Sequence, residues 1–133
     1  MQLEFAFLCD AATESAGKLN ALGIGIDRLL VQQLPQQHRR LTLVTRMAFD
    51  SDDQGDRQFA IELIGPDGSA VAPKVQGNLH VQVGEGVTFM RANMIIEVAN
   101  PRFTVAGPHE AKLSLDGEEL VVLPLEVAVQ AAS

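Results

Sequence analysis

Apolar and polar residues alternate along most of the chain. In the segment 41–49, every second position carries one of a mainly apolar set: Leu41, Leu43, Thr45, Met47 and Phe49. A period of two places these side chains on one face of a strand, whereas a helix needs apolar residues three and four positions apart. No amphipathic helix pattern competes with this period, so the chain is predicted to be all-β.

Similar patterns predict about seven to nine short strands with turn-forming residues between them. The expected strands lie at residues 3–9, 19–31, 41–49, 57–64, 79–83, 87–98, 103–105, 111–115 and 120–129. Residues 10–18 and 32–40 are expected to be connections, the first with one helical turn at most. Strands at this spacing are typical of an antiparallel β-sandwich, immunoglobulin-like or related. Because no linker or repeat interrupts the pattern, residues 1–133 are expected to form a single domain.

Turn residues indicate how some strands pair. Asp116-Gly117 predicts a tight turn between 111–115 and 120–129, because such turns need positive φ. The segments 41–49 and 57–64 are expected to form a second hairpin. Pro124 lacks an N–H group, which predicts that the last strand lies at a sheet edge. Gly23 and Gly25 indicate a bulge or a close backbone approach inside a strand.

Charge and composition restrict the partners. The formal net charge is −7, and nucleic acids and anionic membranes bind clustered Lys and Arg, so binding to either is not expected. The chain has no Trp or Tyr, and its six Phe residues are expected in the core. No apolar run approaches the roughly 20 residues of a membrane span, and Glu4 interrupts the first apolar run, so a cytoplasmic protein is expected.

An acidic segment at 50–56 resembles part of a calcium loop. Oxygen-bearing side chains occupy alternate positions, at Asp50, Asp52, Gln54 and Asp56, and Gly55 stands at the sixth position. The twelfth position is Ile61 instead of glutamate, and strands flank the loop where helices are typical. A calcium site and a solvated acidic turn are therefore both open.

Two arginines lie in the middle of apolar strand patterns. Arg46 and Arg91 either pair with an acid on a neighbouring strand or bind an anionic ligand or partner from an open sheet face. Asp27 and Arg28 form a similar candidate beside the glycines at 23 and 25.

The remaining reactive side chains show no catalytic or metal-binding spacing. The three histidines, His38, His80 and His109, are far apart, and Cys9 has no CxxC partner. Cys9 ends an apolar strand, so a buried and unreactive thiol is expected. No catalytic residue and no cofactor are predicted.

Two segments carry a resemblance to a known family. FAFLCDAA at 5–12 with GKLNALGIGIDR at 17–28, and LSLDGEEL at 113–120 with PLEV at 124–127, resemble a family of small uncharacterised bacterial proteins. The resemblance implies a β-sandwich domain of unknown function and supplies no catalytic residues.

The favoured function is a non-enzymatic protein-binding or assembly module that uses its loops or an edge strand. Self-association through the last strand is one version of this hypothesis. The alternatives are a small enzyme with a site assembled from distant strands, and a component of a larger shell or secretion assembly.

Overall fold

The alternating segments form strands that build two facing sheets. The computed structural model describes residues 1–130 and contains twelve strands and one short 3-10 helix. In chain order the elements are β1 (Gln2–Cys9), β2 (Ala11–Ser15), β3 (Lys18–Leu22), β4 (Arg28–Val31), β5 (Gln36–Gln37), β6 (Arg40–Phe49), η1 (Ser51–Asp53), β7 (Gly55–Ile64), β8 (Val75–Val81), β9 (Met90–Ala99), β10 (Arg102–Phe103), β11 (Gly107–Leu115) and β12 (Glu118–Val129).

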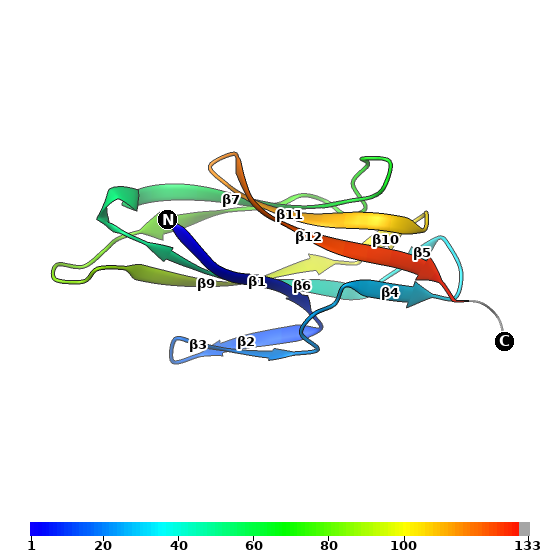
Figure 1. The fold of residues 1–133 in the computed structure, drawn as a ribbon, viewed down its shortest axis with the longest axis horizontal. Helices are drawn as coiled ribbons and strands as arrows, with labels where there is room; N and C mark the ends of the chain where they lie inside the picture. The colour runs from blue at the N-terminus through cyan, green and yellow to red at the C-terminus, as the bar shows by residue number, and fades with distance from the viewer. Residues whose placement is uncertain (131–133) are drawn as a thin grey trace.

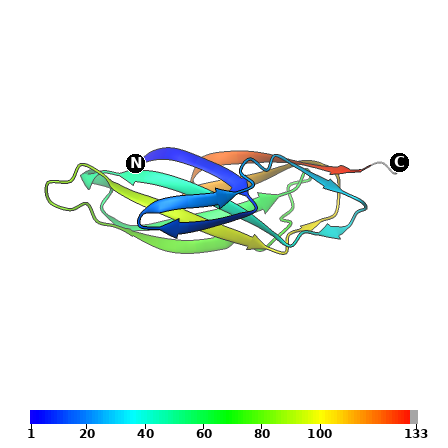
Figure 2. The same ribbon diagram turned by 90° about the horizontal axis from the view of Figure 1, so that it is seen from below.

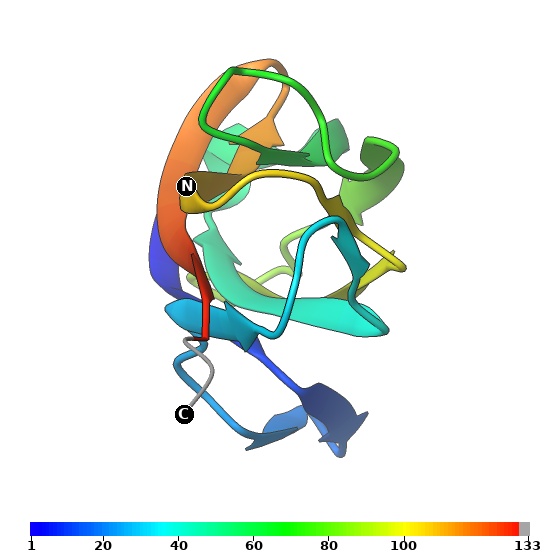
Figure 3. The same cartoon turned by 90° about the vertical axis from the view of Figure 1, so that its right-hand side faces the viewer.

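The larger sheet has five strands in the order β4-β12-β11-β7-β8, and the smaller one has three in the order β1-β6-β9. Neighbouring strands are antiparallel except β4, which runs parallel to β12. Figures 1 and 3 show the two sheets as facing layers, and their inner faces share one hydrophobic cluster that includes Phe49 and Phe103. The all-β prediction is therefore confirmed, whereas the immunoglobulin-like topology stays a prediction.

The predicted hairpin between residues 41–49 and 57–64 is wrong. β6 pairs with β1 and β9 in the smaller sheet, whereas β7 pairs with β11 and β8 in the larger one. The chain changes sheets through η1, where Asp50 and Asp53 form a reciprocal capping box. Both strands have an apolar face, and these faces meet across the core instead of lying side by side in one sheet.

The segment 10–31 also differs from its prediction. Residues expected to form a loop instead form β2, which turns at Ala16-Gly17 and pairs with β3. The expected strand 19–31 is divided into β3 and β4, because Gly23 and Gly25 adopt positive φ between them. A Cβ at Gly23 would also overlap the Asp10 carboxylate. The short strands β2 to β5 and β10 raise the number of strands above the predicted range.

The β2–β3 hairpin forms a third layer. Figures 1 and 3 show it standing on the side of the three-stranded sheet that faces away from the larger sheet, and Figure 2 shows it lying across these strands. Its root is fixed where the Thr42 hydroxyl donates to the carbonyl of Asp10, 3.4 Å away. Its turn is fixed where the side-chain amide of Asn93 donates to the carbonyl of Gly17 at 3.0 Å.

The C-terminal hairpin is confirmed. β11 pairs with β12, and Asp116 and Gly117 both have positive φ in the turn between them. The edge position predicted for the last strand is only partly correct, because β4 covers β12 from Glu126 to Val129. Pro124 lies just before that stretch. At Pro124, β12 has no β4 residue opposite it, so the missing N–H of proline costs no hydrogen bond to β4.

Within residues 1–130, no helix is long and apolar enough to cross a membrane.

Candidate functional site

Three of the four predicted calcium ligands at residues 50–56 use a side-chain oxygen in separate contacts. Asp50 caps η1 by accepting from the backbone amide of Asp52 at 2.9 Å. Gln54 accepts from the backbone amide of Val83 at 3.2 Å, and Asp56 pairs with Nδ1 of His80 at 2.8 Å. These contacts fix the turn between β6 and β7, and each of the three side chains contacts a different partner.

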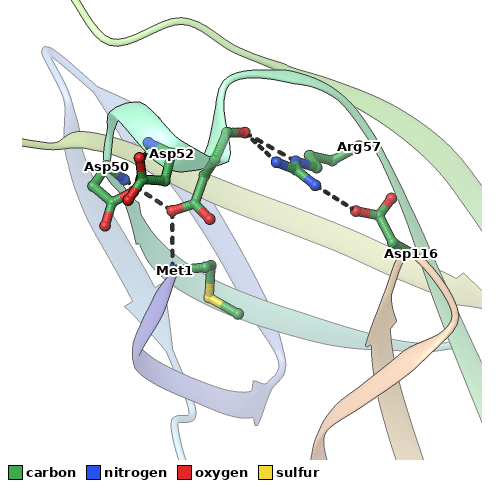
Figure 4. Close-up of polar contacts among 6 residues, drawn as sticks. Met1, Asp50, Asp52, Arg57 and Asp116 are labelled. Carbon is green, nitrogen blue, oxygen red and sulfur yellow. Dashed lines mark hydrogen bonds and ion pairs between the residues drawn. The ribbon is translucent and has the colours of Figure 1, made fainter.

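Asp53 is the centre of a local polar network whose partners Met1, Asp50 and Arg57 are labelled in Figure 4. Its carboxylate lies 2.9 Å from the amino group of Met1 and accepts from the backbone amide of Asp50 at 2.9 Å. The hydrogen bond from the Met1 ammonium group, followed by that from the Asp50 amide, lowers the pKa of Asp53 from its ordinary value. Sequence reasoning passed over Asp53 because it interrupts the alternation of the calcium pattern.

A calcium site receives no support from this arrangement. In the part of the chain that the structure describes, no group of three or more His, Cys, Asp or Glu side chains is placed to hold a metal ion. Calcium needs six to eight oxygen ligands around one point. The four predicted oxygens do not converge, because Asp50 caps η1 while Asp56 extends to His80 on β8.

Arg57 connects this turn to the C-terminal hairpin. Its guanidinium donates to the carbonyl of Asp53 from Nε at 2.9 Å and from Nη2 at 2.6 Å, and its Nη1 lies 3.1 Å from the Asp116 carboxylate. Asp116 also accepts from the backbone amide of Gln58 at 2.9 Å. The hydrogen bond from Gln58, and then that from Arg57, lower the pKa of Asp116. Figure 4 shows Arg57 between the β6–β7 turn and Asp116 of the C-terminal hairpin, so this network has a structural role.

The structure brings the two predicted arginines together. Arg46 on β6 and Arg91 on β9 both donate from Nε to the same carboxylate oxygen of Glu4, at 3.1 and 3.0 Å. Arg46 also donates to the side-chain oxygen of Asn93 at 3.1 Å. The pairing with an acid on a neighbouring strand is therefore confirmed for Arg46, whereas Arg91 on β9 reaches the same acid, Glu4 on β1, across β6. The binding of an anionic ligand or partner stays a prediction, and sequence reasoning did not identify Glu4 as the shared acid.

A β-bulge in β1 places Glu4 beside the two arginines. Leu3 is opposite Met47 and Phe5 is opposite Arg46, so the register shifts between Leu3 and Phe5. A shift of one residue moves the following side chains to the opposite face of a sheet. Leu3 therefore packs against the core, whereas Phe5 does not belong to the core cluster and is 39% exposed.

The prediction that the phenylalanines lie in the core is wrong for Phe5, Phe7 and Phe89. Phe5 and Phe7 stack with their ring centroids 5.8 Å apart, outside the core cluster. Phe89, which precedes β9, is 38% exposed and lies beneath the Arg91 guanidinium, 5.8 Å from ring centroid to Cζ. Phe49 and Phe103 are fully buried as predicted, and Phe59 packs against the core.

The arginine–phenylalanine surface consists of Phe5, Phe7, Arg46, Phe89 and Arg91. It lies on the outer face of the three-stranded sheet beside the β2–β3 hairpin. The side chain of Arg91 is 46% exposed, and its Nη1 and Nη2 make no hydrogen bond within residues 1–130. This surface therefore presents aromatic rings and unused donors together.

Asp27 and Arg28 lie elsewhere. Arg28 begins β4 and is opposite Glu126 of β12 in the larger sheet, and the carbonyl of Asp27 accepts from the backbone amide of Glu126 at 2.8 Å. Both side chains are exposed. They are not part of the arginine–phenylalanine surface, and their role as ligand contacts stays a prediction.

Cys9 and the histidines form no common site. Cys9 is fully buried, and burial, with the nearby Asp10 charge second, raises the pKa of its thiol. His109 is buried against Phe103, with its Nδ1 3.0 Å from the carbonyl of Gly107, and its Nε2 has no hydrogen-bond partner among the described residues. The buried thiol agrees with the prediction.

Comparison with protein families gives one finding. The model of a family of unknown function, DUF6941, matches residues 4–128, and the chain belongs to this family. This confirms the expected domain of unknown function, whereas the resemblance of the two particular segments and a bacterial origin stay predictions. A comparison with curated proteins finds no match.

Proposed function

We propose that this member of a family of unknown function is a non-catalytic protein-binding module, and that the arginine–phenylalanine surface contacts its partner. The observation that carries the proposal is the gathering of exposed phenylalanine rings and two arginines on the outer face of the three-stranded sheet. Arginine and aromatic residues are enriched where protein interfaces are fully buried.

The bulge in β1 supports a role for these rings beyond folding. Without the register shift, Phe5 and Phe7 would point into the core with Leu3. The sheet instead exposes part of their apolar area to water, which costs roughly 25 cal/mol for each Å² left unburied. A partner that covers the rings would recover this free energy.

The charges of the surface define the chemistry of the partner. Two guanidinium groups share one carboxylate of Glu4, which leaves one positive charge in excess on a chain of net charge −7. The free Nη atoms of Arg91 match the oxygens of a carboxylate. The expected partner therefore presents an Asp or Glu side chain beside apolar side chains.

Two described surface hollows contain few ionisable side chains. One hollow of about 450 Å³ lies on the larger sheet and is lined by side chains such as Gln58, Gln76 and Asn78, and another of about 540 Å³ lies against the β2–β3 hairpin. Lys74 is the only ionisable side chain that lines either of these two described hollows. General acid–base catalysis needs positioned titratable groups, which neither hollow contains as a set.

Site-specific cross-linking in cells that naturally produce the chain tests this proposal. A photoreactive phenylalanine analogue replaces Phe5 or Phe89 in the full chain, and the matched control carries it at Lys112 on the outer face of the other sheet. We expect an adduct with a defined partner protein from Phe5 and Phe89 and none from Lys112. The charge reversal Arg91→Glu, combined with the analogue at Phe5, is expected to reduce the adduct at least tenfold.

Three results would overturn the proposal. The first is that Phe5 and Phe89 yield no adduct while the variants remain folded by circular dichroism. The second is an equal yield from Lys112, and the third is an adduct that Arg91→Glu leaves unchanged. The second and third results would each remove the link between the surface and recognition.

A further inference from the structure

The second open surface is the edge of the five-stranded sheet at β8. β8 is the last strand in the order β4-β12-β11-β7-β8, and within residues 1–130 it pairs with β7 alone. Its seven residues, Val75–Val81, follow the sheet alternation, with Gln76, Asn78 and His80 exposed. The other edge of this strand therefore offers backbone N–H and C=O groups to an additional strand.

β8 lacks the features with which edge strands usually prevent such pairing. Charged side chains, prolines, bulges and very short length all oppose edge-to-edge association. β1 has a bulge and Glu4, β9 has Arg91 and Glu97, and β4 is only four residues long and begins with Arg28. β8 has neither Asp, Glu, Lys, Arg nor Pro, and its register with β7 is regular from Val75 to Val81.

We propose that β8 pairs with β8 of a second copy of this chain, antiparallel about a two-fold axis at Asn78, so that the two five-stranded sheets become one continuous sheet. This proposal concerns a different surface from that of the proposed function. It also moves the predicted self-association away from β12, because β4 covers the end of that strand.

The sequence of β8 complements itself in this arrangement. A two-fold axis at Asn78 places Val75 opposite Val81 of the second copy and Gly77 opposite its Leu79, all on the inner face. On the outer face, Asn78 meets its own copy and Gln76 meets His80 of the second copy. Apolar residues meet apolar ones, polar residues meet polar ones, and no two like charges face each other.

Disulfide trapping tests this geometry directly. Residues opposite each other in an antiparallel pair have Cα atoms about 4.5–5.5 Å apart, which lies within the range that a disulfide spans. The variant Asn78→Cys is therefore expected to form a covalent dimer under mild oxidation. The matched control is Gln58→Cys, which is opposite Asn78 on β7 but one strand inside the edge. The native Cys9 is fully buried and serves as the background in both variants.

The solution mass provides the second measurement. The unmodified chain is expected to sediment at twice its 14.3 kDa mass. Asn78→Lys would place two ammonium groups against each other at the axis, so it is expected to raise the dimer dissociation constant at least tenfold. Gln58→Lys adds the same charge on β7, where it does not face its own copy across the axis, so it is expected to leave the dimer intact.

The proposal is wrong if the unmodified chain remains at 14.3 kDa from micromolar to millimolar concentration. It is equally wrong if Asn78→Cys and Gln58→Cys give the same yield of covalent dimer, or if the two lysine variants weaken the dimer equally. Cross-linking from Phe5 and Phe89 is independent of these results, so this proposal and the proposed function can fail separately.

Discussion

The division of the phenylalanines into core and surface residues predicts how strongly each one supports the fold. Phe49 is fully buried on the inner face of β6, whereas Phe5 is 39% exposed on the outer face of the same sheet. Truncation of Phe49 to alanine removes its transfer free energy and leaves a cavity, which together cost about 3–5 kcal/mol. A chain of this size loses about 3–5 °C of melting temperature for each kcal/mol, so Phe49→Ala should melt roughly 10–25 °C lower.

The cost for Phe5 is smaller because its ring borders solvent. Full burial of a phenylalanine side chain contributes about 1.5–3 kcal/mol, and Phe5 is 39% exposed, so Phe5→Ala should cost about 1–2 kcal/mol. No enclosed cavity forms there, because solvent or the neighbouring Phe7 ring fills the space. The two variants should therefore differ by about 1–4 kcal/mol, with Phe49→Ala the less stable.

Urea denaturation measures both values on the same scale, provided that the slope of the transition is unchanged. Phe103→Ala is the matched control, because Phe103 is also fully buried, and it should resemble Phe49→Ala. Equal losses of stability for Phe5→Ala and Phe49→Ala would refute the reasoning. They would mean that the bulge in β1 does not turn Phe5 away from the core.

Three further predictions follow from the polar contacts and the buried thiol. The pKa of the Asp116 carboxyl is lowered by its hydrogen bonds with Gln58 and Arg57, so the ionised carboxylate contributes stability at neutral pH. This contribution is lost as the pH falls below the ordinary carboxyl pKa of about 4. In thermal melts from pH 7 to 2, Asp116→Asn should therefore reduce the loss of stability at acidic pH, whereas the control Glu14→Gln should not. Millimolar calcium should leave the melting temperature unchanged, because the oxygens of Asp50, Gln54 and Asp56 have separate partners, and a rise of several degrees would contradict this geometry. Cys9 should react with a thiol reagent at least a hundredfold more slowly in buffer than in denaturant, and rapid native labelling would show that β1 opens readily.

The local sequence pattern was sufficient to predict several features of the structure. The period of two located most strands, and Asp116-Gly117 identified the turn of the C-terminal hairpin, because both depend on residues close together in the chain. Arg46 and Arg91 were recognisable as candidates because each is a charged residue inside an apolar strand pattern. Their shared acid, Glu4, was not recognisable, since nothing local connects residues so far apart in sequence.

Other features required the tertiary structure. β6 and β7 have the pattern of a hairpin, yet they belong to different sheets. Residues 11–15 have no marked alternation, and they form β2 because they pair with β3 and rest on the outer face of the three-stranded sheet. The candidate site depends on the same long-range choices, because the bulge that exposes Phe5 appears only in the register with β6.

The sequence by itself determined that the protein is all-β, where most strands lie and which residues share a face within each strand. These properties follow from the two-residue period and from turn residues, which act over a few positions. The tertiary structure alone decided which strands are neighbours, where the register shifts and which phenylalanines face water. Backbone hydrogen-bonding groups are the same in every strand, so they specify no partner, and a shift of one residue reverses the two faces of a strand at little cost in hydrogen bonds.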